Sequence, residues 1–130
     1  MWEWQLAGSE VVEVRQNADR LTLRLSAVTA RVMEVPPGEA PPEWGYALGV
    51  LLDLHHPQVQ QCDDHASGRI AEGQLTQEGL PLLHIPLPVV RMHAAELELQ
   101  FANGAVLRAT ARAWQCRFVA EPRFRESYAC

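Results

Sequence analysis

Apolar and polar residues alternate with a period of two along most of this chain, which is the pattern of β-strands with one buried face. Near the start, Trp2, Trp4 and Leu6 are separated by polar or small residues. From Tyr46 to Leu54 both faces are largely apolar, which predicts a central strand. No window has a convincing helical period longer than two turns. The pattern therefore predicts an all-β protein.

The first of two similar β-hairpins is predicted over Val12–Val32. A loop at Gln16–Asp19 places Val14 opposite Leu21 and keeps Val12 on the same apolar face. A half-buried hairpin requires such a register, because a slip of one residue would turn every apolar side chain outward.

The second hairpin is predicted over Leu97–Phe118, where an Asn-Gly pair gives a strong turn signal. A three-residue loop, Asn103–Ala105, keeps the apolar residues on one face and places Leu99 opposite Ala109. Gly104 then adopts the left-handed conformation of a bulged turn.

Both second strands shift their apolar phase by one residue, between Leu25 and Val28 and between Ala111 and Trp114. Such a shift predicts a bulge or bend where a strand turns a corner. Two explanations of this shared phase shift remain open: an internal duplication, or two unrelated strands that bend in the same way. We expect one domain, residues 1–130, forming a small antiparallel β-barrel or a bent two-sheet sandwich of about eight or nine strands.

Composition narrows the function mainly by exclusion. The formal charge of −5 argues against a nucleic-acid partner. All 11 basic residues are arginine and are scattered along the sequence, which favours codon bias in a GC-rich, bacterial genome over selection for arginine's bidentate donors. Cys62, Cys116 and Cys130 are too widely spaced for a disulfide framework. The chain has no apolar stretch long enough for a membrane helix and no secretory signal at its start, so we expect an acidic cytoplasmic protein.

One group of side chains has metal-ligand chemistry: His55, His56, Cys62 and His65. Imidazole and thiolate are ligands of zinc and iron, and these residues converge if the loop folds back on the strand end. Only Cys62 and His65 have a spacing that resembles a metal site, and no cofactor is predicted. The sequence contains no nucleophile–base motif, so an enzyme is the less favoured class.

Trp44 and Tyr46 follow a Pro-rich segment and predict an exposed aromatic patch that faces a partner. Three functions remain open. The favoured one is a non-enzymatic protein-interaction module, resembling an immunity protein or a chaperone in role, that binds another protein or a second copy of itself. The alternatives are a β-barrel that binds a small ligand between aromatic walls and a metal-dependent enzyme that uses the histidine–cysteine group.

Overall fold

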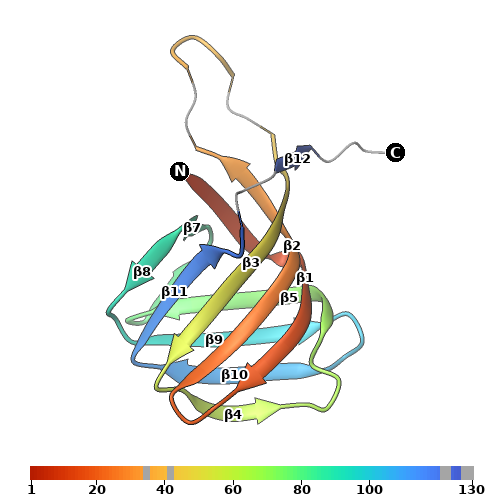
Figure 1. Ribbon diagram of the computed structural model, residues 1–130, viewed down its shortest axis with the longest axis vertical. Coiled ribbons are helices and arrows are strands. Elements are labelled where there is room, and N and C mark those ends of the chain that lie inside the picture. Colours follow the sequence, from red (N-terminus) through yellow and green to blue (C-terminus); the bar gives the residue numbers. More distant parts are fainter. Residues whose placement is uncertain (34–35, 41–42, 121–123, 127–130) are drawn as a thin grey trace.

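The structure, a computed structural model, describes residues 1–33, 36–40, 43–120 and 124–126, which contain β-strands and no helix (Figure 1). Cys130 lies outside these residues. The strands are β1 (Trp2–Gln16), β2 (Arg20–Val32), β3 (Gly45–His55), β4 (Gln58–Cys62), β5 (Gly68–Gln77), β6 (Leu80–Leu82), β7 (Ile85–Leu87), β8 (Val89–Arg91), β9 (Ala95–Phe101), β10 (Val106–Ala111), β11 (Ala113–Phe118) and β12 (Phe124–Glu126). The all-β prediction is confirmed. The strands outnumber the predicted eight or nine, because β6, β7, β8 and β12 are three-residue segments that pair with longer neighbours.

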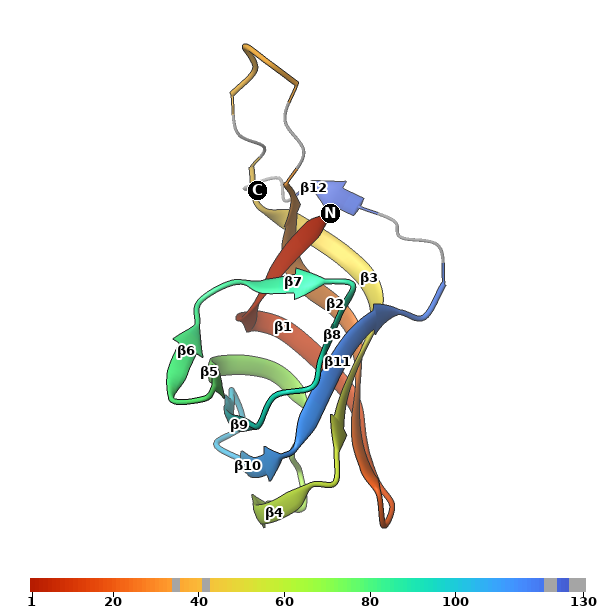
Figure 2. The ribbon, with the colours of Figure 1, turned by 90° about the vertical axis from the view of Figure 1, so that its left-hand side faces the viewer.

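All pairings are antiparallel and follow the order β4-β10-β9-β5-β1-β2-β3-β11-β8, with β6, β7 and β12 added beside β5, β1 and β3. The sheet folds over into two layers. A front layer contains β1, β2, β3 and β11, and a back layer of β5, β9, β10 and β4 runs across behind it (Figures 1 and 2). Strands β4 and β8 end the path, so no hydrogen-bond ladder between the described strands closes the sheet.

The inward residues of both layers form a hydrophobic core. Trp4 and Leu52 from the front layer and Leu97 from the back layer are almost completely buried in it. Burying a side chain of this size contributes about 1.5–3 kcal/mol. The buried Trp114 on β11 donates its indole N–H to the side-chain oxygen of Gln77 on β5 at 3.1 Å, which links the two layers. Trp4 and Trp114 therefore serve as packing residues.

The predicted bends in both second strands are confirmed by burial. In β2, Leu25 and Val28 are both buried and the two residues between them are partly exposed. In the other hairpin, the consecutive residues Ala113 and Trp114 are both buried, so the apolar phase shifts between Ala111 and Trp114 as predicted. The two bends differ, because β2 stays between β1 and β3 throughout, whereas the chain leaves the back layer at the end of β10 and enters the front layer as β11.

The predicted register of the first hairpin is wrong by two residues. The turn is tighter than expected, because the backbone N–H of Asn17 donates to the carbonyl of Arg20 at 2.9 Å. Val14 consequently lies opposite Leu23. Val12, which was expected to be buried, is 47% exposed because the β1–β2 register shifts at this residue. A β-bulge thus turns one predicted core residue outward.

In the second hairpin the Phe101 N–H donates to the Ala105 carbonyl at 2.9 Å, so the loop has the predicted three residues but begins one residue earlier, at 102–104. Gly104 has a φ of 89°, as predicted for a bulged turn. Leu99 lies opposite Leu107, again two residues from the predicted partner. The Asn103 amide donates at 2.8 Å to a carbonyl of the loop between β4 and β5, a contact that fixes the turn to another part of the fold.

Candidate interaction surface

Arginines that are scattered in the sequence gather on the outer surface of the front layer. On β2, Arg20, Thr22 and Arg24 point outward, because the residues between them are buried in the core. The antiparallel register sets Thr22 opposite Asp53 and Arg24 opposite Leu51, both on β3. The strand alternation thus places one arginine on each side of the Thr22–Asp53 pair.

The neighbouring strands complete this surface. Arg15 on β1 lies opposite Thr22, and Arg117 on β11 lies opposite Leu51. We call the outward side chains here the arginine face: Arg15, Arg20, Thr22, Arg24, Leu51, Asp53 and Arg117. They line an open hollow of about 470 Å³ that also includes Glu13, Asn17 and Val119. Four positive charges against two negative ones leave a formal charge of +2 there, on a chain whose total is −5.

Asp53 lies at the centre of the arginine face and is only 1% exposed. The Thr22 hydroxyl donates to one carboxylate oxygen at 2.6 Å, and the Gln115 amide donates to the other at 3.0 Å. The Arg117 Nε atom is 3.8 Å from the second oxygen. A buried carboxylate is costly unless it is hydrogen-bonded, and both oxygens are satisfied here by protein donors. Asp53 therefore anchors β2, β3 and β11 to one another.

The arginines around Asp53 are only partly neutralised. Arg15 forms an ion pair with Glu13 at 3.0 Å, but both side chains are well exposed, and such pairs contribute about 0–1 kcal/mol. Arg117 keeps a side chain that is 52% exposed. No ion pair joins Arg20 or Arg24 to another of the described residues. Cationic groups therefore remain open to a binding partner.

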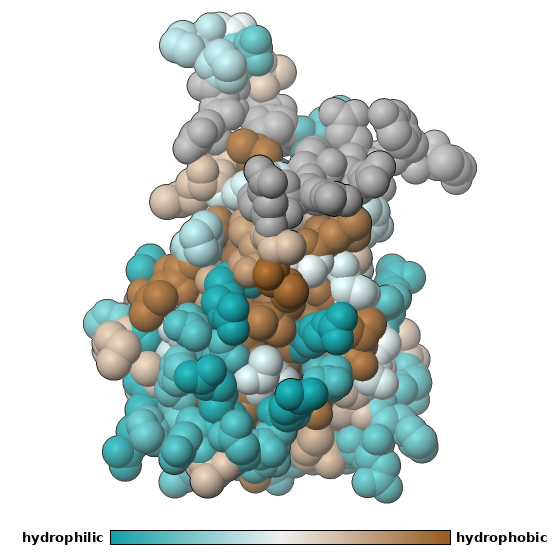
Figure 3. All heavy atoms as spheres, viewed as in Figure 1, coloured by the Kyte–Doolittle hydropathy of each residue, from teal (hydrophilic) through white to brown (hydrophobic). Residues whose placement is uncertain are grey.

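An exposed apolar column runs along β3 beside these arginines. Tyr46 and Leu48 are 39% and 42% exposed, and Leu51 is partly exposed further along the strand. Val119 covers Gly49, where φ is 70°, and its N–H donates to the Gly49 carbonyl at 2.8 Å. We call Tyr46, Leu48, Leu51 and Val119 the apolar column. In Figure 3, which shows this face, hydrophobic residues gather over the middle of the sheet and strongly hydrophilic ones lie around them.

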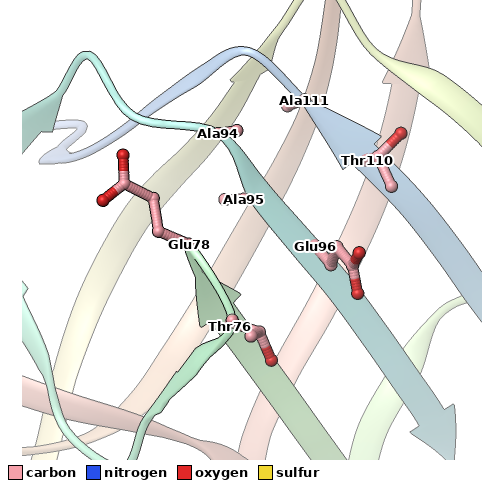
Figure 4. Close-up of a pocket in the computed structure, with 8 residues that line it drawn as sticks. Thr76, Glu78, Ala94, Ala95, Glu96, Thr110 and Ala111 are labelled. Atoms are coloured by element: carbon pink, nitrogen blue, oxygen red, sulfur yellow. The ribbon is translucent and has the colours of Figure 1, made fainter.

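The outer surface of the back layer has the opposite charge. Glu72 on β5 and Glu96 and Glu98 on β9 point outward, with Arg108 on β10 beside them. We call these four residues the glutamate face; their formal charge is −2. A small hollow of about 160 Å³ lies at one end of it. Figure 4 shows Glu96 there, on the strand between those that carry Thr76 and Thr110.

The two aromatic residues predicted to contact a partner have different surroundings. Trp44 packs within the molecule, with the Arg31 guanidinium 4.6 Å from its ring centroid and the His84 ring at 5.0 Å. Arg31 is held in turn by an ion pair with Glu3. Tyr46 belongs to the exposed apolar column. The structure therefore places Tyr46, more than Trp44, where a partner has access.

The four side chains predicted as metal ligands lie at the end of β3, in the turn before β4, at the end of β4 and in the loop after it: His55, His56, Cys62 and His65. Among the described residues, no three His, Cys, Asp or Glu side chains are arranged to hold a metal ion. Burial, followed by the charges of Asp63 and Asp64, raises the pKa of the Cys62 thiol. That shift favours the protonated thiol, which is a poorer nucleophile than the thiolate.

Sequence reasoning missed the arginine face. The outward alternation of Arg20, Thr22 and Arg24 was visible, but it marks only an exposed strand face. Arg15 and Arg117 come from other strands, and their proximity depends on the order β1-β2-β3-β11. The sequence does not specify that order.

Known proteins provide no functional assignment for this chain, so a functional proposal rests on the geometry of its surface. No protein-family model matches the chain, and no curated protein or solved structure shows significant similarity to it. In the part of the chain that the structure describes, there is no helix capable of crossing a bilayer.

Proposed function

We propose that this protein is a non-enzymatic protein-interaction module that binds its partner through the arginine face and the apolar column. The observation that carries this proposal is the exposed apolar column, whose Leu51 end lies between Arg24 and Arg117. Protein interfaces characteristically have an apolar centre and a polar rim, and tyrosine and arginine are enriched among the residues that contribute most to affinity. Tyr46, Leu48 and Leu51 provide the centre in this arrangement.

A macromolecular partner fits this surface better than a small molecule. Small-ligand sites are concave and enclose most of the ligand, whereas the hollow over the arginine face is open. The polar groups at its floor are also occupied, because Asp53 binds Thr22 and Gln115. The aromatic residues proposed as ligand-cavity walls give no support to that alternative, since Trp4 and Trp114 are packed in the core.

We also propose that the protein acts in a reducing cytoplasm, in a bacterium. Both described cysteines, the exposed Cys62 and the buried Cys116, are free thiols, which is consistent with such a compartment.

The proposal is tested by affinity capture with matched surface variants. Leu48→Glu places a charge in the apolar column, and Val90→Glu places the same charge on β8, where Val90 is 63% exposed. We expect wild type and Val90→Glu to retain the same partner, identified by mass spectrometry, and Leu48→Glu to retain about tenfold less. Thermal unfolding verifies that both variants are folded. Equal retention by Leu48→Glu contradicts the proposal.

A further inference from the structure

The arginine face contains a row with a defined spacing. The register places Leu51 on β3 between Arg24 on β2 and Arg117 on β11. Neighbouring strands lie about 4.8 Å apart, so the two arginine backbones are separated by about 10 Å. One partly exposed apolar side chain, Leu51, thus lies between the two strand positions that carry these arginines.

The same face disfavours a single small anion at its centre. The buried carboxylate of Asp53 lies there, and a second negative charge placed directly over it would be repelled. Arg24 and Arg117 lie one strand to either side of Leu51, the next outward residue along β3 from Asp53. Two separated carboxylates therefore suit the surface better than one phosphate-sized ion.

We propose that the arginine face binds an acidic segment of a partner protein in which two carboxylates flank one apolar side chain. This inference rests on the proposed function. In an extended segment, residues i and i+4 share one face about 13 Å apart, with residue i+2 between them. The flexible arginine side chains reach both acids, with bidentate guanidinium–carboxylate hydrogen bonds, and the central apolar side chain packs on Leu51.

The direct test is a titration followed by NMR with the capped peptide Gly-Glu-Ser-Leu-Ser-Glu-Gly. We expect shifts centred on the amides of Arg24, Leu51 and Arg117. Arg24→Ala and Arg117→Ala should each weaken binding about fivefold, the effect of losing one exposed charge pair. Arg108→Ala removes the same charge from the glutamate face and serves as the matched control, with unchanged affinity.

Control ligands separate the chemistry of the segment from charge alone. Replacing both glutamates of the peptide by lysine should abolish binding, and replacing its leucine by serine should weaken it. Equal binding of the lysine peptide, or unchanged affinity in Arg24→Ala and Arg117→Ala, overturns the inference. Tighter binding of inorganic phosphate or of an oligothymidylate than of the acidic peptide overturns it as well.

A second copy of the chain is the other possible source of acidic groups, because the glutamate face carries the opposite charge. Sedimentation velocity of the chain alone distinguishes this case. Self-association that is abolished by both Arg24→Ala and Glu98→Ala assigns the surface to a second copy and overturns the inference; a monomer at all concentrations supports it.

The two proposals fail separately. If the acidic peptide does not bind but Leu48→Glu still loses its partner, the acidic segment is wrong and the interaction surface stands. If Leu48→Glu retains its partner, the proposed function is wrong, and peptide binding then reports only an isolated affinity for acids.

Discussion

The hairpins β1–β2 and β9–β10 have the same inner design and opposite outer charge. Each presents apolar residues to the core, exemplified by Leu23 and Leu97, and each leads into a bent strand. Outward, the first hairpin carries Arg20 and Arg24, whereas the second carries Glu98. Inner positions are constrained by packing, while outer ones are free to vary. The inner face of each hairpin thus specifies the fold, and the outer face carries the charged groups that we propose for binding.

The bends of the two hairpins also have different consequences. Strand β2 bends within the front layer, but the bend between β10 and β11 moves the chain from the back layer to the front. That crossing brings Arg117 to the surface formed by the first hairpin. The strand that follows the second hairpin therefore contributes Arg117 to the arginine face, although the outer surface of the hairpin itself is acidic.

The largest expected effect comes from substitutions in the core that the two hairpins share. Leu23→Ala and Leu97→Ala each remove a completely buried side chain, one from each hairpin. Each should lower the free energy of unfolding by about 2–5 kcal/mol. Urea denaturation followed by fluorescence should show one cooperative transition in both variants. Two separate transitions would mean that the layers fold independently and that the hairpins do not share one core.

A smaller effect should separate the two outer faces. Asp53→Ala leaves the partly buried Thr22 hydroxyl and Gln115 amide without their acceptor, which should cost about 1–3 kcal/mol. Glu98→Ala removes a carboxylate from the exposed glutamate face and should change stability by less than about 0.5 kcal/mol. Equilibrium denaturation of the two variants makes the comparison. Equal losses would show that Asp53 has no special anchoring role.

A pH-dependent effect distinguishes the two described thiols. Burial raises the pKa of Cys116 well above its ordinary value of 9.0, so the folded state keeps this proton when the unfolded state releases it. The stability that this thiol contributes is present below pH 9.0 and is lost as the pH rises above it. At about pH 10 the loss is about 1.4 kcal/mol.

Urea denaturation near pH 7 and pH 10 measures this loss. Cys116→Ala should remove it, whereas Cys62→Ala, at an exposed site in the back layer, should leave most of it in place. An identical alkaline loss in wild type and Cys116→Ala would contradict the assignment to Cys116.

The sequence by itself determined which side chains of the regular strands face inward; Val12, at the β1 bulge, is an exception. Period-two alternation sorts residues between two faces whatever strand lies beside them, so the all-β class and both bends could be predicted. The left-handed Gly104 was also predictable, because the Asn-Gly turn is a local feature. Tyr46 was identified as an exposed aromatic residue because it follows a Pro-rich segment, which is also a local feature.

Only the tertiary structure decided the register of the hairpins and the composition of the arginine face. A slip of two residues leaves every side chain on its own face, so alternation cannot detect it; turn hydrogen bonds such as those of Asn17 and Asn103 select the register. The arginine face depends further on strand order. Arg24 and Arg117 become neighbours of Leu51 because β2 and β11 pair with opposite edges of β3, and that long-range pairing is not encoded in any local pattern.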